Sequence, residues 1–474
     1  MSSETSTAIT PTGSISGIRL PSGAAEYRGI RYANAGRFKA PIDVLENGQV
    51  DASAYQPICP QLPGALETMV SVVEPMSEDC TFLNVYTPSG ATDQSRLPVL
   101  FWIHGGAYTN GSGSLSWYNG SSLATRDCVV VTINYRLGVF GFLGDANLGL
   151  HDMVSALRWV QRNIASFGGD ANNVTIFGES AGGSALVALM ACESATGLFH
   201  KVWAMSPSIG QLRDQMSAQH WKTQFLEIVK AQSIDDLANL TTDQLLAAQA
   251  ELLTRPSTNF DMFTPTAAGD LLSSDILQTA AINPVPFVVG TNRDENKLWT
   301  AFDATLNDAG QDHWTQVLEK QFGAKASDAK KAYEALRPGD SVKDLCSAVQ
   351  TDVSFRSRAI SLAERRSANG MPTWMYWFTW QSPAFGGILG CCHALDIPFA
   401  FDNLHQDGAN MFTGEGPERV HIASTFAHHI SAFAKSSKAD WPAYDQEARL
   451  TLEINESTEV LSDPESEIRV LFSR

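Results

Sequence analysis

Residues 173–190 change character abruptly, and this change limits the folds that are open to the chain. Residues 173–177 read Asn-Val-Thr-Ile-Phe, a β-branched run typical of a strand, and residues 181–190 are small or apolar, as in a buried helix. Between them stands Gly178-Glu179-Ser180-Ala181-Gly182. A sharp strand-to-helix turn leaves room only for small residues two positions from the serine. The pattern predicts a nucleophile elbow that holds the Ser180 hydroxyl out of a sheet.

Other apolar runs predict the sheet to which this elbow belongs. Residues 97–103 and 128–134 have the length and β-branched content of buried parallel strands, and a later run covers residues 285–289. Between 150 and 167, apolar residues recur at steps of three and four, as on one face of a crossover helix. Strand, helix and strand in this order predict an α/β fold with a mostly parallel, doubly wound sheet.

The length of 474 residues allows several domains, but α/β enzymes with large insertions also reach this size around one sheet. We expect one elaborated domain spanning residues 1–474. Two polar, helical stretches, about 211–281 and 303–366, are interpreted as insertions. Packed over the carboxyl ends of the strands, they would wall a substrate gorge.

Charge and composition exclude several classes of partner. The chain has 51 acidic and 33 basic residues, a net charge of −18, so nucleic acid and anionic membranes are not expected to bind. No apolar run is long enough for a bilayer span. The N-terminal residues lack the basic and apolar segments of a secretory signal, so a cytoplasmic location is expected. Seven cysteines, an odd number in a long chain, do not suggest a disulfide framework.

Two further patterns resemble cofactor or metal motifs without completing them. Gly111-Ser112-Gly113 lacks the third glycine of a dinucleotide fingerprint and the lysine of a phosphate loop, so no nucleotide cofactor is expected. His421, His428 and His429 could share a helix face, but no accompanying carboxylate or metalloprotease pattern is present. A solvated helix face explains them better than a metal site.

The loop after residues 97–103 reads His104-Gly105-Gly106-Ala107. Glycine-rich backbone can turn several N–H groups toward one point, and the N–H groups of Gly106, Ala107 and Ala181 are predicted to bind a developing oxyanion. Gly105 and Glu179 would support that site. The alternative is a plain glycine turn after a strand.

Several motifs follow one another along the chain: Tyr-Arg-Gly-Ile-Arg-Tyr-Ala at 27–33, Ser-Glu-Asp-Cys-Thr-Phe-Leu-Asn-Val-Tyr at 77–86, Trp-Ile-His-Gly-Gly at 102–106, Asn-Tyr-Arg-Leu-Gly at 134–138, Phe-Gly-Gly-Asp at 167–170 and the elbow itself. In these motifs and their order the chain resembles the type-B carboxylesterase family, and the resemblance implies the α/β-hydrolase fold.

The resemblance implies which residues complete a catalytic triad with Ser180. Residues 290–295 resemble the family's acid segment and place the carboxylate on Glu295, with Asp294 as the alternative. Residues 393–399 resemble the base segment, so His393 is expected to be the general base. Ser206 falls where the family keeps a serine near the acid and is expected to be a supporting residue.

The family also implies structural pairs. Arg37 is expected to pair with Glu78, and Arg136 with Asp152. Cys59 and Cys80 match positions that secreted relatives join by a disulfide, and the sequence leaves open whether they stay thiols here.

The expected function is that of a serine carboxylesterase that uses an acyl-enzyme and no cofactor. Uncharged esters with short or medium acyl groups, including aryl or benzyl esters, are the expected substrates. Residues 60–79 contain no aromatic residue, so choline esters are not expected, because relatives hold choline on a tryptophan there. Hydrolysis of amides, carbamates or lactones, and a non-catalytic adhesion role, are the alternatives. The oligomeric state stays open.

Overall fold

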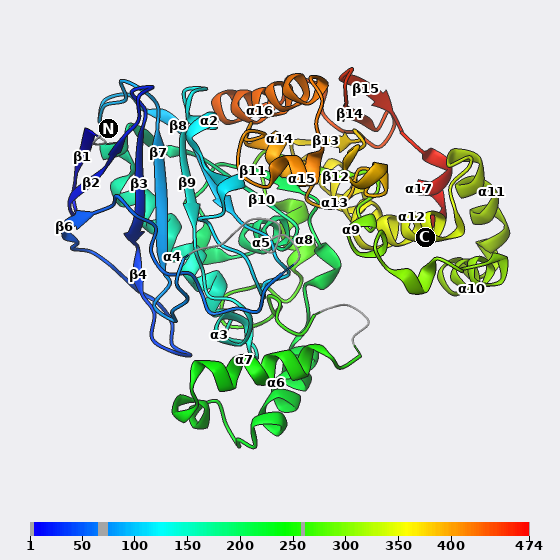
Figure 1. The fold of residues 1–474 in the computed structure, drawn as a ribbon, viewed down its shortest axis with the longest axis horizontal. Coiled ribbons are helices and arrows are strands. Elements are labelled where there is room, and N and C mark those ends of the chain that lie inside the picture. The colour runs from blue at the N-terminus through cyan, green and yellow to red at the C-terminus, as the bar shows by residue number, and fades with distance from the viewer. Residues whose placement is uncertain (1–3, 65–73, 257–260, 474) are drawn as a thin grey trace.

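The computed structural model describes residues 4–64, 74–256 and 261–473. Thirteen strands within these ranges form one twisted sheet, in the order β1-β2-β3-β7-β9-β8-β10-β11-β12-β13-β14-β15, with β6 beside β2 (Figure 1). These strands are β1 (Glu4–Thr10), β2 (Gly13–Arg19), β3 (Ala25–Arg31), β6 (Gly48–Asp51), β7 (Phe82–Thr87), β8 (Leu97–Ile103), β9 (Val129–Ile133), β10 (Gly169–Glu179), β11 (Lys201–Met205), β12 (Phe287–Asn292), β13 (Thr373–Phe378), β14 (Leu450–Ile454) and β15 (Glu459–Ser462). A small separate sheet pairs β4 (Ala33–Asn34) with β5 (Ile42–Asp43).

The centre of the large sheet is parallel and its edges are antiparallel, except that β6 pairs parallel with β2. From β9 through β8, β10, β11, β12 and β13 to β14, every neighbouring pair is parallel. The strands β1, β2, β3 and β7 pair antiparallel at one edge, and β15 does so at the other. The predicted α/β fold with a mostly parallel sheet is therefore confirmed.

The two faces of the sheet carry separate cores, as a doubly wound sheet requires. In β8, Val99, Phe101 and Ile103 pack with α4 (Leu148–Asn163), α5 (Ala181–Met190) and α8 (Ile276–Ile282). The alternate residues Leu100 and Trp102 pack on the other face with α14 (Ile397–Ala400) and α16 (Glu418–Ser436). Both faces are buried because successive side chains of a strand point to opposite sides.

The two stretches interpreted as insertions are largely helical. The first contains α6 (Gln215–Val229), α7 (Thr242–Leu253) and α8, and the second contains α10 (Gln311–Phe322), α11 (Ala326–Leu336), α12 (Val342–Thr351), the π-helix η8 (Asp352–Arg356) and α13 (Ser357–Ala368). Of these, α6, α7, α8 and α13 also bury residues in the main core. Figure 1 shows α6 and α7 below the sheet, and α10 to α12 with α17 (Ser466–Phe472) at its right end. Within the described ranges, no helix combines the length and the apolar character that a bilayer crossing requires.

Candidate active site

Ser180 occupies the turn between β10 and α5, in a backbone conformation that few non-glycine residues adopt. Its φ is +55° and its ψ is −120°, and such strain is stored where the surrounding structure fixes it. A Cβ atom on Gly178 would lie 2.6 Å from the Ile103 carbonyl oxygen, and one on Gly182 would lie 2.1 Å from the same atom. The elbow packs so tightly on β8 that only glycine fits at both positions. The Ser180 residue itself remains 9% exposed.

The glycine-rich loop after β8 lies directly against this elbow. A Cβ atom on Gly105 would approach the Glu179 carbonyl oxygen to 2.8 Å and the Ser180 Cβ to 3.1 Å. Gly106 and Ala107 both have positive φ, +98° and +51°. Among the described residues, the backbone N–H groups of Gly106, Ala107 and Ala181 have no acceptor. Unpaired donors beside a strained serine are what an oxyanion site requires.

Glu295 and His393 meet beneath this loop. His393 Nδ1 lies 2.6 Å from Glu295 Oε2, so Nδ1–H donates to the carboxylate. The other carboxylate oxygen accepts the N–H of Asn292 at 2.8 Å. Asp294, the alternative acid, instead accepts hydrogen bonds from Arg337 at 2.6 Å and from the N–H of Cys391 at 3.1 Å. The geometry therefore pairs the imidazole with Glu295.

Glu179 faces the other nitrogen of the same imidazole, with Oε1 3.1 Å from His393 Nε2. Burial raises the pKa of Glu179 to about 8, although the nearby His393 acts against this rise. Burial would lower the pKa of His393, but Glu179 and then Glu295 outweigh it and raise that pKa to about 9. Because each group responds to the other's charge, they titrate as a coupled pair.

The Ser180 hydroxyl is turned toward a residue that sequence reasoning missed. Ser180 Oγ lies 3.4 Å from Ser208 Oγ, and the N–H of Ser208 donates to the Ser180 carbonyl at 3.3 Å. No hydrogen bond joins Ser180 Oγ to His393 Nε2 among the described residues. The only sequence signal for Ser208 is its place just after β11, the strand beside β10.

Ser206, expected as a supporting residue, lies fully buried next to this group. Its φ is +41°, and its N–H donates to the Gly290 carbonyl at 2.8 Å. Its hydroxyl has no partner within the described part of the chain. The arrangement fixes the backbone between β11 and β12, close to the acid segment.

Two aromatic rings that sequence reasoning did not single out line His393. Trp299, on α9 (Lys297–Thr300), and Phe355, on η8, have ring centroids 5.1 and 4.7 Å from the imidazole. Trp299 is 52% exposed although it contacts a buried histidine. Its spacing of one helical turn from Glu295 is the signal that could have identified it.

The two predicted ion pairs are confirmed. Arg37 Nε lies 2.7 Å from Glu78 Oε2, and Arg136 contacts both carboxylate oxygens of Asp152, at 2.8 and 2.7 Å. Cys59 and Cys80 are buried free thiols, and Cys59 Sγ accepts the N–H of Leu137 at 3.2 Å.

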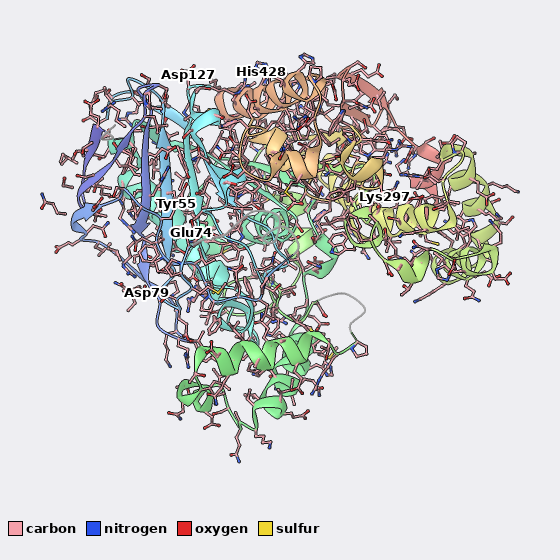
Figure 2. All side chains as sticks on the ribbon, viewed as in Figure 1. Tyr55, Glu74, Asp79, Asp127, Lys297 and His428 are labelled. Atoms are coloured by element: carbon pink, nitrogen blue, oxygen red, sulfur yellow. The ribbon has the colours of Figure 1, made fainter. Side chains whose placement is uncertain are left out.

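The remaining candidates have structural partners or lie outside the described residues. His428 and His429 lie on α16, where Figure 2 shows His428 at the surface, and both approach Asp440, at 3.5 and 2.7 Å. The Gly111 N–H donates to Gln61 Oε1 at 2.6 Å and so serves loop structure. Residues 65–73, most of the loop considered for choline, lie outside the described residues.

A doubly wound sheet, a strained serine between β10 and α5, and a carboxylate–imidazole pair beside it define an α/β-hydrolase. Comparison with known proteins gives the family. A model of the carboxylesterase family matches residues 4–469. The para-nitrobenzyl esterase of Bacillus subtilis (strain 168) is 35% identical over 478 residues, covering 94% of each chain.

Further relatives agree. The liver carboxylesterase of Sus scrofa is 30% identical, with 84% of this chain and 78% of that protein covered. A solved PNB esterase structure has a TM-score of 0.86 at 33% identity and covers 99% of both chains. The chain belongs to the carboxylesterase family, and it is a carboxylic ester hydrolase with the α/β-hydrolase fold. The expected resemblance is confirmed.

Proposed function

We propose that Ser180, His393 and Glu295 form the catalytic triad of this esterase. The observation that carries the proposal is the buried 2.6 Å contact of His393 with Glu295 beside the strained Ser180 elbow. Glu295 fixes the imidazole tautomer with the proton on Nδ1, which leaves Nε2 free to act as the base.

In the proposed reaction, Ser180 rotates from Ser208 toward His393, and Nε2 takes its proton as Oγ attacks the ester carbonyl. The N–H groups of Gly106, Ala107 and Ala181 bind the oxyanion of the tetrahedral intermediate. Its collapse breaks the ester C–O bond, and His393 returns the proton to the leaving alcohol. Water activated by His393 then hydrolyses the acyl-enzyme and releases the acid.

The proposed substrates are uncharged esters with short or medium acyl groups, including aryl and benzyl esters. The exposed ring of Trp299 beside His393 supports an aromatic group in the substrate, because aromatic pairs stack favourably. The net charge of −18 supports the preference for substrates without negative charge.

We further propose that the chain forms one domain over residues 1–474 and works in the cytoplasm. The family match from residue 4 to 469 supports the single domain. All seven cysteines are described, buried and unpaired, which suits a reducing compartment.

The triad is tested by Ser180→Ala with p-nitrophenyl acetate as substrate. We expect kcat to fall by about 10⁴-fold or more, because loss of the nucleophile removes the acyl-enzyme route. Ser431→Ala, which removes another buried hydroxyl far along the chain on α16, should keep full activity. Retained turnover in Ser180→Ala would remove the proposed mechanism. Rates on matched ester and amide substrates then define the preferred bond.

A further inference from the structure

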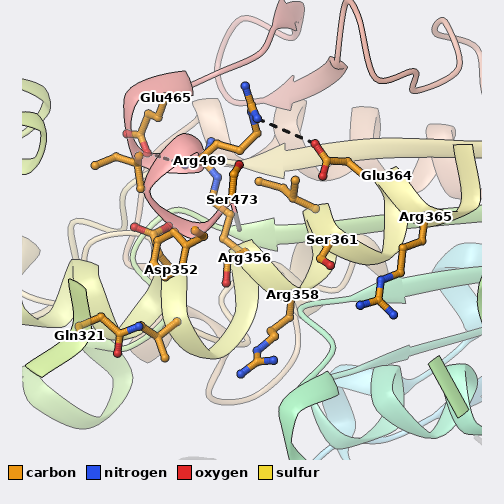
Figure 3. A pocket seen from close by; sticks show the side chains of 15 residues that line it. Gln321, Asp352, Arg356, Arg358, Ser361, Glu364, Arg365, Glu465, Arg469 and Ser473 are labelled. Atoms are coloured by element: carbon orange, nitrogen blue, oxygen red, sulfur yellow. Dashed lines mark hydrogen bonds and ion pairs between the residues drawn. The ribbon is translucent and has the colours of Figure 1, made fainter. Parts of the chain in front are cut away.

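A cavity of about 470 Å³ lies at the right end of the molecule, where α13 and η8 face α17 (Figure 3). Its volume falls within the usual range of small-molecule sites. Neither Ser180, Glu295 nor His393 lines it. The cavity is thus separate from the proposed catalytic centre.

Two of the arginines that line the cavity form ion pairs with carboxylates of the protein. Arg356 pairs with Glu465 at 2.5 Å, and its guanidinium lies 4.0 Å over the ring of Trp377. Arg469 contacts both carboxylate oxygens of Asp463 at 2.7 Å. The first pair joins η8 to the start of α17, and the second joins α17 to the segment that leads into it.

Two other arginines on its edge are unbalanced. Arg358 and Arg365 line the cavity from α13 and are exposed, and within the described ranges their guanidinium groups have no ion pair or hydrogen bond. They stand two helical turns apart, about 10 Å along the axis, and Ser361 lies between them (Figure 3). In a chain with a net charge of −18, two neighbouring unpaired guanidinium groups form a local site for an anion.

The same cavity has an apolar side. Ile360, Ile468 and Phe472 contribute to its lining next to the arginines. A guanidinium matches the planar, two-oxygen geometry of a carboxylate, and the apolar side chains can cover a hydrocarbon tail. We propose that this cavity binds an amphipathic carboxylate, with its head on Arg358 or Arg365 and its tail toward α17.

The cavity connects with the catalytic residues through η8. This π-helix lines the cavity with Asp352 and Val353, while its Phe355 packs on the ring of His393 at 4.7 Å. Thr351, just before η8, accepts the N–H of Asn296, the neighbour of Glu295, at 3.0 Å. Single π-helical turns occur frequently at functional sites. A ligand that moves η8 would therefore shift side chains that contact His393 and the backbone next to Glu295.

Binding is tested by isothermal titration calorimetry with octanoate as the probe. We expect the double variant Arg358→Gln/Arg365→Gln to bind octanoate about tenfold more weakly than the unaltered protein, since it removes the charged hydrogen bonds to the carboxylate. Arg96→Gln removes an exposed arginine outside the cavity and should leave binding unchanged. Equal affinity in the double variant would place octanoate elsewhere and overturn the proposal.

Acetate tests the apolar part of the site. It has the same head without the tail, so we expect it to bind at least tenfold more weakly than octanoate. Equal affinity for both probes would overturn the amphipathic ligand class. These measurements need no turnover, so their outcome is independent of the proposed triad.

The connection through η8 is tested by kinetics, and this step rests on the proposed function. With a short ester as substrate, octanoate should lower kcat in the unaltered enzyme, because occupancy of the cavity shifts Phe355 against His393. In the double variant this loss should disappear, leaving only competition that raises KM. An equal fall in kcat in both enzymes would rule out the connection. A carboxylate is a product of ester hydrolysis. Binding of that product in the cavity would therefore lower kcat as the product accumulates.

Discussion

At the scale of single residues, the charge of His393 depends on two carboxylates that flank its imidazole. Glu295 holds Nδ1 at 2.6 Å, and Glu179 lies 3.1 Å from Nε2. A base must be neutral to accept the serine proton. Because the pKa of His393 is raised, its neutral form predominates only at higher pH. The activity of this enzyme should therefore rise with pH beyond the range of an ordinary histidine, toward about 9.

We expect Glu179→Gln to move the acidic limb of the kcat/KM profile to lower pH. The substitution removes the charge that acts most strongly to raise the pKa of His393, while the carboxylate of Glu295 remains. Measurement of kcat/KM between pH 5 and 10 checks the shift. Glu251→Gln removes an exposed carboxylate from α7 and should leave the profile in place. An unmoved limb in Glu179→Gln would show that Glu179 does not control the base.

The sequence supplied the candidate residues at this scale by motif, and the structure added their neighbours. Ser180 and the turn around it could be predicted because glycine, strand and helix signals coincide there. Glu295 and His393 are far apart in sequence, and only the family resemblance suggested them. The contact of Ser208 with Ser180 could not be predicted, because a hydroxyl contact depends on side-chain directions that no local pattern encodes. Trp299 has one signal in the sequence, its spacing of one helical turn from Glu295.

At the scale of elements, the elbow depends on how closely α5 approaches β8. The substitution Gly182→Ala would add a Cβ atom 2.1 Å from the Ile103 carbonyl oxygen and 2.8 Å from the His104 carbonyl oxygen. Alanine favours a helix over glycine by about 1 kcal/mol, but overpacking against rigid backbone costs about 3 kcal/mol. We expect a lower thermal midpoint and a large loss of kcat, measured by differential scanning fluorimetry and ester hydrolysis.

Gly310→Ala is the matched control, since a Cβ atom there meets nothing within 4 Å. It should change neither the midpoint nor the rate. A stable and fully active Gly182→Ala variant would mean that α5 can move from β8 without disturbing Ser180.

The elements that could be predicted from the sequence are those whose residues are buried along almost their whole length. β8 and β9 are buried on both faces, so they appear in the sequence as continuous apolar runs. β1 and β2 alternate between buried and exposed residues and are built from Ser, Thr, Gly and Ile, which gives a weak pattern. The π-helix η8 has no sequence signature, because one extra residue in a turn changes no periodicity over so short a length.

At the scale of the whole molecule, Arg136 ties together three distant segments. Its guanidinium contacts Asp152 on α4 and donates to the carbonyls of Gly36 and Lys39, at 3.2 and 2.7 Å. Arg136 and Asp152 are almost completely buried, so neither charge can be solvated in place of its partner.

We expect Asp152→Asn to destabilise the protein by about 3–5 kcal/mol, because it leaves a buried guanidinium without its counter-charge. The shift in the urea unfolding midpoint, followed by tryptophan fluorescence, measures the effect. Asp79→Asn breaks an exposed pair with Arg31 and should cost less than about 1 kcal/mol. Similar unfolding midpoints for the two variants would contradict the claim that the buried pair of Arg136 and Asp152 contributes more to stability than the exposed pair.

The catalytic candidates leave three different strands in turn, with Ser180 after β10, Glu295 after β12 and His393 after β13. During synthesis, a ribosome-bound chain that has not yet exposed residue 393 therefore lacks the proposed base, however well its first half has folded. Under the proposed mechanism, the nascent chain has no esterase activity until nearly the last fifth of translation, and a chain cut before that point leaves no partly active fragment.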